Sequence, residues 1–369
     1  MMTYKERVDE FWNWFGGVAE RFFNTIENGN CGDLQEETTN AVNKLGLGAW
    51  VYGPGPKEKG GHSLTISGEG VIHKQFLTEY WLSKAPTLEG WTFYAARQPE
   101  NFGACIEING LKIDFKAIWV KTKIDEENEN IDLEVWHHEF PNLEDSAKFR
   151  ITFLVLDEVL GEYGTGNWIG EINFASTAPQ DIIPITELSE FVDQLQASTQ
   201  WEKCPPTETY QSYRVTPCEE DFPRSDLMTL STSNSKLVWE YLNAEGDYES
   251  PIKGTGADFI FISFPMSILP KGAEVDFRAD LEDSLETQLK ASGAGQLFGG
   301  SLGEVNAYID LAIYDGERSI EIIKSVLKER SLPSETTIHF FDKDREIIDL
   351  REQIHDEKKP SFLRKLFKR

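Results

Sequence analysis

The spacing of apolar residues between positions 258 and 341 divides this stretch into six segments, and no other feature constrains the fold as strongly. Residues 258–264 are a nearly unbroken apolar run. Within 305–313 every odd-numbered residue is apolar, whereas the even-numbered residues include Asn306 and Asp310. Apolar residues recur at helical spacing within 281–289 and again within 320–327, before 336–341 returns to a strand pattern. An apolar period of two predicts a half-buried strand, and a period near 3.6 predicts a helix.

The order strand, helix, strand, strand, helix, strand is the βαββαβ pattern of the ferredoxin-like fold. Five glycines within 293–303 follow the first of these helices. A phosphate-binding loop follows a strand and opens a helix, so we interpret Gly293 as a helix C-cap and Gly299–Gly300 as a hairpin or bulge. The ferredoxin-like fold hosts many unrelated functions, so this pattern predicts architecture without chemistry.

Residues upstream of 198 predict a second α+β domain. A strongly amphipathic helix covers residues 8–26, a further helix runs from about Leu143 to Tyr163, and a strand follows at Ile169–Phe174. Within 111–123 the apolar positions slip from odd to even numbers, which indicates a bulge or break in the strand. The predicted fold class is therefore α+β, with an N-terminal mixed α/β sheet domain followed by a C-terminal ferredoxin-like βαββαβ sandwich.

Four segments follow from these patterns. Residues 1–197 form the first domain and residues 226–345 form the ferredoxin-like domain. Between them, residues 198–225 contain four prolines among polar residues and lack hydrophobic periodicity, which is typical of a linker. Residues 346–369 are predicted to hold a polar helix, around Arg345–His355, and a basic tail.

The net charge of −27 restricts the partners of this chain. Duplex binding depends on Lys and Arg side chains that neutralise phosphates, so we expect no nucleic acid partner. A basic protein partner, approached through electrostatic steering, is compatible with this charge. No apolar run approaches the ~20 residues of a membrane span, and the first residues do not resemble a signal peptide, so the expected location is the cytoplasm.

Cysteine and histidine spacing predicts neither a metal site nor a cofactor. Four scattered cysteines form no CxxC pair, although Cys204 and Cys218 flank one proline-rich segment. His137 and His138 are adjacent, so a strand would send them to opposite faces, with His137 on the apolar side. We interpret His137 as a core-edge histidine, and as a ligand-binding residue in the alternative function given below.

Arg97 is the sharpest candidate binding residue in the first domain. It lies in phase with the apolar positions Trp91, Phe93 and Ala95, so its guanidinium is expected to be partly buried. A buried arginine requires a carboxylate or several carbonyls, and Glu107 or Asp114 could serve. The two interpretations are an anion-binding pocket and a structural ion pair.

The last twelve residues contain six basic residues and no acidic one. A basic amphipathic helix of this kind can lie on an anionic membrane surface or bind a partner, though so short a helix binds weakly. The predicted contact residues are Phe362, Leu363, Arg364, Lys365, Leu366, Phe367, Lys368 and Arg369. Docking on the acidic surface of the protein itself, and disorder, are the alternatives.

About residues 1–195 resemble an uncharacterised bacterial family of the domain-of-unknown-function kind. The resemblance rests on Phe11–Phe15, Leu64–Gly70, Ala85–Pro86, Gly90–Pro99, Phe149–Tyr163 and Ile169–Phe174. It implies a fold for this half and no catalytic residue. Some proteins of this general kind look like immunity or accessory proteins that accompany bacterial toxins.

These observations predict a non-enzymatic, acidic protein-binding module of the inhibitor or immunity kind. One alternative is an enzyme or small-anion-binding domain that uses Arg97, Glu107 and His137. Another is a peripheral membrane protein that attaches through its basic tail. The absence of an assembled catalytic motif favours the first prediction, although catalytic groups meet in space rather than in sequence.

Overall fold

The computed structural model describes residues 2–99, 105–108, 111–199, 201, 204–272 and 274–350, and gives only the backbone of 106–108 and 111. The chain is an α+β protein. It divides into two compact units. The C-terminal unit comprises Met1–Phe15, Asn43–Gly46 and Tyr210–Arg369, and the N-terminal unit comprises Gly16–Val42 and Leu47–Thr209. Helix α1 (Tyr4–Glu27) therefore contributes its first half to one unit and its second half to the other.

A seven-stranded antiparallel sheet organises the C-terminal unit, in the order β10-β11-β13-β14-β12-β15-β16. Its central strands arise from the segments whose apolar spacing predicted them. The strands are β10 (Gln211–Arg214), β11 (Leu227–Thr232), β12 (Asp258–Pro265), β13 (Gly295–Gly303), β14 (Asn306–Ile313), β15 (Thr337–Phe340) and β16 (Ile348–Asp349). The predicted strand–helix–strand–strand–helix–strand order between residues 258 and 341 is present.

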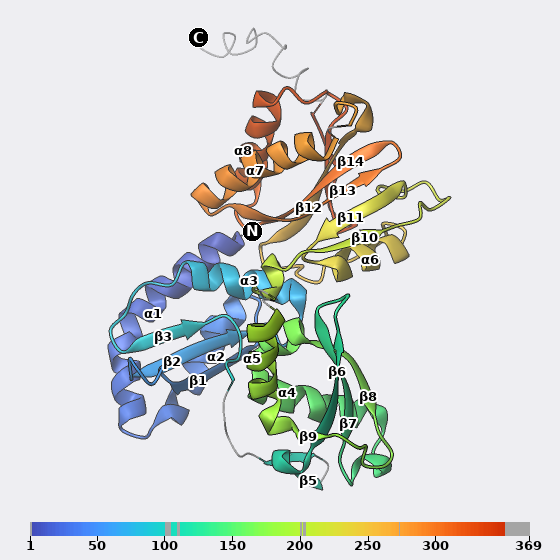
Figure 1. The fold of residues 1–369 in the computed structure, drawn as a ribbon. Helices are drawn as coiled ribbons and strands as arrows, with labels where there is room; N and C mark the ends of the chain where they lie inside the picture. Colours follow the sequence, from blue (N-terminus) through green and yellow to red (C-terminus); the bar gives the residue numbers. More distant parts are fainter. Residues whose placement is uncertain are drawn as a thin grey trace. The chain divides into compact units, whose positions relative to one another are not determined.

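Helices cover both faces of this sheet (Figure 1). Helices α7 (Glu274–Ser292) and α8 (Glu317–Glu329) pack on one face, where Ile262, Ile309 and Leu285 are completely buried. Helix α6 (Ser235–Asn243) packs on the other face through contact between the rings of Tyr241 and Phe261. Because both faces are buried, the central strands are almost continuously apolar rather than alternating with exposed polar residues.

The glycine-rich segment after α7 contains the predicted helix C-cap and a bulge. Gly293 follows the end of the helix with a positive φ of 61°. The register of β13 against β14 shifts between Leu297 and Gly299, which marks a bulge rather than a hairpin turn at this point.

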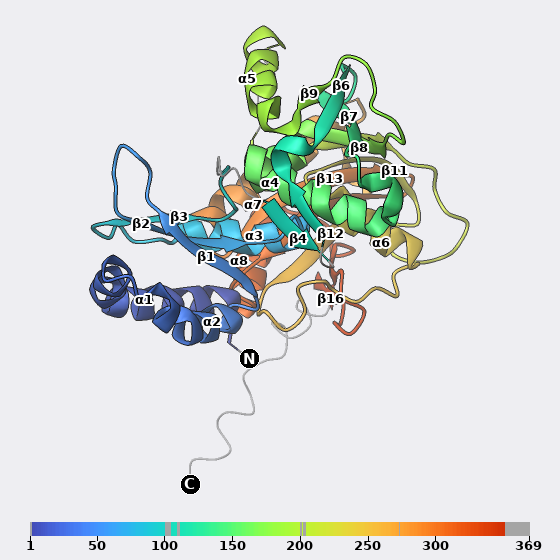
Figure 2. The same cartoon turned by 90° about the horizontal axis from the view of Figure 1, so that it is seen from below.

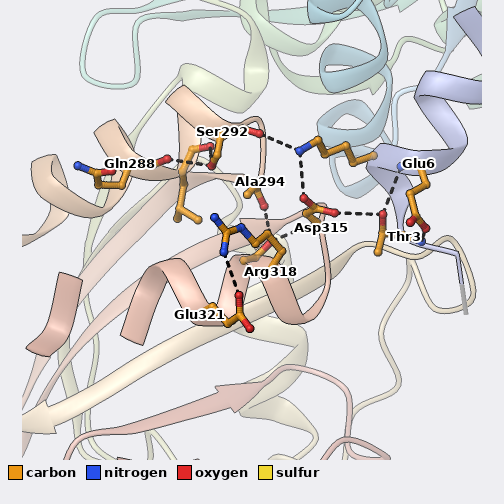
Figure 3. A network of polar contacts seen from close by, with 11 residues as sticks. Thr3, Glu6, Gln288, Ser292, Ala294, Asp315, Arg318 and Glu321 are labelled. Carbon is orange, nitrogen blue, oxygen red and sulfur yellow. Dashed lines mark hydrogen bonds and ion pairs between the residues drawn. The ribbon is translucent and has the colours of Figure 1, made fainter. Parts of the chain in front are cut away.

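The N-terminal segment is an integral part of the C-terminal unit (Figure 3). The Lys5 backbone N–H donates to the carbonyl of Tyr314, and its ammonium group donates to the Ser292 carbonyl at 2.9 Å and to Asp315 at 3.0 Å. The Thr3 hydroxyl donates to the same Asp315 carboxylate. These contacts join the start of α1 to the last residue of α7 and to the loop that follows β14.

The N-terminal unit contains three smaller sheets. Strands β1 (Ala49–Pro54), β2 (His62–Ser67) and β3 (Trp91–Tyr94) form a mixed sheet in which β2 and β3 are parallel. A four-stranded mixed sheet has the order β8-β7-β6-β9, and β4 pairs with β5. These strands are β4 (Cys105–Ile108), β5 (Leu111–Asp114), β6 (Trp119–Asp125), β7 (Asn130–Trp136), β8 (Ile169–Phe174) and β9 (Ile183–Pro184).

Helices complete two apolar cores in this unit. Helices α1 and α2 (Gln35–Lys44) run along one side of the three-stranded sheet (Figure 2), where the rings of Phe22 and Tyr52 meet. Trp81 of α3 (Ile72–Ser83) contacts Phe93 of the same sheet. Helices α4 (Asp145–Trp168) and α5 (Leu188–Thr199) enclose a second core over the four-stranded sheet.

One predicted break is present, and two predicted segments differ from what the structure contains. The break expected within 111–123 is a 3₁₀ turn at Phe115–Ala117 between β5 and β6. Residues 198–225, predicted as a linker, include β10 and the completely buried Arg224. Part of the polar helix expected around 345–355 is instead the short strand β16, and the remainder from 351 lies outside the described residues.

The basic tail, including the predicted contact residues Phe362–Arg369, also lies outside the described residues, so its membrane or partner contact stays a prediction. Among the described residues, none of the helices combines the length and apolar character that a bilayer-spanning segment needs. Cys204 and Cys218 are free thiols.

Candidate functional site

A cavity of about 860 Å³ lies in the N-terminal unit, where residues of the three-stranded sheet face helix α4. Residues of the β1–β2 hairpin and Tyr94 of β3 line the cavity, as do Leu154, Asp157 and Glu158 of α4. Arg97, Gln98 and Pro99, which follow β3, extend the lining. A volume of this size is typical of sites that bind small molecules.

Strand alternation gives the sheet wall its hydroxyl groups. Successive side chains of a strand point to opposite faces, so Ser63, Thr65 and Ser67 of β2 line the cavity while Leu64 and Ile66 are completely buried on the other face. Thr65 pairs in register with Tyr94 of β3, another cavity residue. The wall therefore presents a row of neutral hydrogen-bonding groups.

A break in α4 shapes the adjoining end of the site. Gly161 has φ 74° and ψ 163°, which interrupts the helix. A Cβ atom at this position would lie 2.9 Å from Cδ of Pro99 and 3.0 Å from the Arg97 carbonyl oxygen. Glycine thus permits both the conformation and the close approach, and the Glu162 N–H donates to the Arg97 carbonyl at 2.9 Å.

This break delivers the Glu162 carboxylate into the interior, where Glu162 is only 2% exposed. The carboxylate accepts hydrogen bonds from the Ser67 hydroxyl at 2.7 Å, the Gly70 N–H at 2.9 Å, the Arg97 N–H at 3.2 Å and the Gln75 amide at 3.3 Å. A buried carboxylate is tolerated when its oxygens are hydrogen-bonded in this way. Glu162 therefore holds β2, α3 and the segment after β3 together beneath the cavity.

Charges of both signs line the cavity itself. Burial raises the pKa of the Asp157 carboxyl, a hydrogen bond with Thr165 opposes this, the Glu162 carboxylate adds to it, and the Arg97 guanidinium lowers it. Arg97 is half-buried, and among the described residues its guanidinium forms no ion pair. The Arg97 side chain thus retains its capacity to bind an anion.

Arg97 lines the cavity, but its surroundings differ from those that the sequence predicts. Strand β3 ends at Tyr94, so Arg97 lies beyond the strand rather than in phase with it. The Asp114 carboxylate accepts the Lys116 N–H at 2.9 Å and caps a 3₁₀ turn, instead of forming an ion pair with Arg97. The side chain of Glu107 lies outside the described residues.

His137 is buried but does not line this cavity. Strand β7 ends at Trp136, so the two histidines do not point to opposite faces, and their ring centroids lie 4.2 Å apart. The Glu139 N–H donates to Nδ1 of His137 at 3.2 Å, and burial lowers the pKa of this imidazole. The expectation of opposite faces is wrong because the strand stops one residue early.

Sequence reasoning missed Asp157 and Glu158 as site residues. The sequence feature that could have identified them is a pair of acidic residues inside an otherwise apolar helical segment, three and four residues after Leu154. This spacing places all three side chains on one face of α4. Polar residues at core-facing positions of a helix are uncommon and point to a partner or a site.

Comparisons of the chain with protein-family models, with curated proteins and with solved structures give no match. The resemblance of residues 1–195 to a domain-of-unknown-function family therefore stays a prediction.

Proposed function

We propose that the N-terminal unit binds a small polar ligand through an anionic group that pairs with Arg97. The observation that carries this proposal is a half-buried guanidinium, with no ion pair among the described residues, in the lining of a cavity of about 860 Å³. An arginine presents a planar set of donors that matches a carboxylate or phosphate in a bidentate manner. The hydroxyl groups of Ser63 and Thr65 supply further hydrogen-bonding capacity.

The arrangement around Ser67 favours binding over nucleophilic catalysis. Its hydroxyl donates to the Glu162 carboxylate and also accepts the Glu69 N–H at 2.8 Å. A nucleophilic serine requires a hydroxyl that faces the substrate and a base that accepts its proton during attack. Here both hydrogen-bonding directions of the hydroxyl serve to hold the local fold.

Titration calorimetry with small anions tests this function. Phosphate, acetate, malonate and citrate are titrated into the full chain and into the Arg97→Gln variant, with Arg150→Gln as the matched control. Arg150 is an exposed arginine on α4 that does not line the cavity. We expect Arg97→Gln to weaken anion binding about tenfold, because one charge-assisted hydrogen-bond pair is lost. Equal binding by the two variants contradicts the proposal.

The net charge of −27 supports a second function, the binding of a basic protein. Affinity capture with the full chain at increasing salt concentration tests it. A stoichiometric basic partner that dissociates as salt rises supports this function, because screening weakens attraction between opposite charges. Such a partner would be expected in the cytoplasm, the compartment that we propose for this chain.

We also propose that the seven-stranded sheet is a ferredoxin-like unit extended by β10, β11 and β16. The order β13-β14-β12-β15, with α7 and α8 on one face, supports this assignment. The fold itself implies no activity for the C-terminal unit.

A further inference from the structure

The charges of the cavity lie on different elements and differ in sign. Asp157 and Glu158 are neighbours on α4, whereas Arg97 belongs to the segment that follows β3. Arg97 lies close enough to Asp157 to lower the pKa of its carboxyl. The cavity therefore presents two cationic groups, the Arg97 guanidinium and the Lys57 ammonium group, and two carboxylates in its lining.

A ligand that carries only negative charge matches only the cationic part of this lining. It would gain the attraction of Arg97 and Lys57 but would also place its charge near Asp157 and Glu158, whose repulsion opposes binding. The buried Glu162 carboxylate beneath the cavity adds a third negative charge, already occupied by four donors. A ligand that carries only positive charge would be repelled by the Arg97 guanidinium.

The remainder of the lining is largely aromatic and apolar. Trp50, Tyr94, Phe115, Leu154 and Pro99 line the cavity together with the charged groups. Side chains of this kind bury the apolar part of a ligand, while a few polar groups fix its orientation. The lining thus matches a ligand with an apolar body and two oppositely charged ends.

We propose, on the basis of the function above, that the ligand is a zwitterion: an amino acid or short peptide with a free carboxylate and a free ammonium group. Its carboxylate pairs with Arg97, and its ammonium group pairs with Asp157. An ammonium group placed there also stabilises the ionised form of Asp157, which burial otherwise disfavours. The apolar side chain occupies the aromatic part of the cavity.

Titration calorimetry with matched ligands tests this assignment. The probes are the common amino acids and a set of dipeptides that end in phenylalanine or leucine. The tightest probe is then compared with its N-acetyl derivative, which lacks the ammonium group, and with its amide, which lacks the carboxylate. We expect each derivative to bind about tenfold or more weakly than the zwitterion, since each loses one charge pair in a partly desolvated site.

Variants assign each end of the ligand to its partner. Arg97→Gln should weaken binding of the zwitterion about tenfold but should not weaken binding of the amide, which has no carboxylate to pair with Arg97. Asp157→Asn should weaken binding of the zwitterion but should not weaken binding of the N-acetyl derivative, which has no ammonium group. The controls are Arg150→Gln on α4 and Asp193→Asn on α5, two exposed positions outside the cavity lining that should change neither.

Two outcomes overturn the zwitterion assignment, and they differ in what they say about the function. If the N-acetyl derivative binds as tightly as the free zwitterion, or if no zwitterion binds at millimolar concentration while malonate or citrate does, the ligand is a simple anion and the proposed function stands. If neither zwitterions nor simple anions bind, both the assignment and the proposed function are wrong.

Discussion

Nη1 of Arg224 lies 2.5 Å from Oδ1 of Asp310, and both side chains are completely buried in the C-terminal unit. Asp310 lies at the centre of β14, and Nη2 of Arg224 also contacts Oδ2 of Asp310 and the Ser301 hydroxyl. The guanidinium further lies against the rings of Phe261, Tyr308 and Phe341. A segment that reads as a linker in sequence thus supplies an ion pair to the core.

Arg224→Met should destabilise the protein by about 3–5 kcal/mol, because it leaves the Asp310 charge buried without its partner. Replacing both residues, as Arg224→Met with Asp310→Leu, should restore most of the loss, since no uncompensated charge remains. Denaturant unfolding measures both. Arg318→Met, which breaks the exposed pair with Glu321, is the control and should change little. A double variant as unstable as the single one would contradict this account.

Ser67→Ala should lower the free energy of unfolding by about 1–3 kcal/mol, because the buried Glu162 carboxylate loses a donor and the Glu69 N–H loses its acceptor. Ser63→Ala is the matched control on the same face of β2, where no hydrogen bond of the hydroxyl occurs among the described residues. Thermal unfolding of the two variants should separate them by several degrees. Equal stability would mean that Glu162 does not depend on Ser67.

Glu282→Gln should change how stability depends on pH. Burial raises the pKa of the Glu282 carboxyl to about 7, Arg278 opposes this shift, and Asp310 adds to it. Because this folded-state pKa exceeds the ordinary value of 4.5, the carboxyl stabilises the fold below about pH 4.5, and this contribution is lost as pH rises through 7.

The side chain of the glutamine variant does not ionise, so this variant does not lose stability as pH rises. Its free energy of unfolding relative to the unmodified protein should therefore increase with pH, by at most about 3 kcal/mol between about pH 4.5 and pH 7. Urea unfolding at pH 5, 6, 7 and 8 measures the difference. His339, whose pKa burial lowers to about 4, contributes equally to both proteins and cancels in this comparison. A difference that does not vary with pH would show that Glu282 titrates normally.

Lys5→Met should destabilise the C-terminal unit by about 1–2 kcal/mol, because its ammonium group donates to both Ser292 and Asp315. Lys271→Met, at an exposed position of the same unit, is the control. Hydrogen exchange of the amides around Tyr314 gives a local readout and should accelerate in the Lys5 variant alone. Unchanged exchange there would mean that the N-terminal segment does not hold this loop.

Local patterns in the sequence were sufficient to predict most helices and strands. The apolar spacing within 258–341 predicted six elements that the structure contains, and the slip within 111–123 predicted the break at Phe115–Ala117. Such predictions succeed because one buried face imposes a period of two on a strand and 3.6 on a helix. Arg97 was singled out because it was taken to be in phase with Trp91, Phe93 and Ala95, although β3 ends at Tyr94 and Arg97 lies beyond the strand.

Tertiary structure alone decided which distant residues meet. Arg224 contacts Asp310 across 86 positions, and Glu162 accepts hydrogen bonds from residues 65 to 95 positions away. The break at Gly161 and the pairing of β10 with β11 likewise depend on neighbours that no local period encodes. The physical reason is that periodicity indicates only whether a side chain is buried. Which residue pairs with a buried charged side chain depends on the packing of elements that are far apart in the chain.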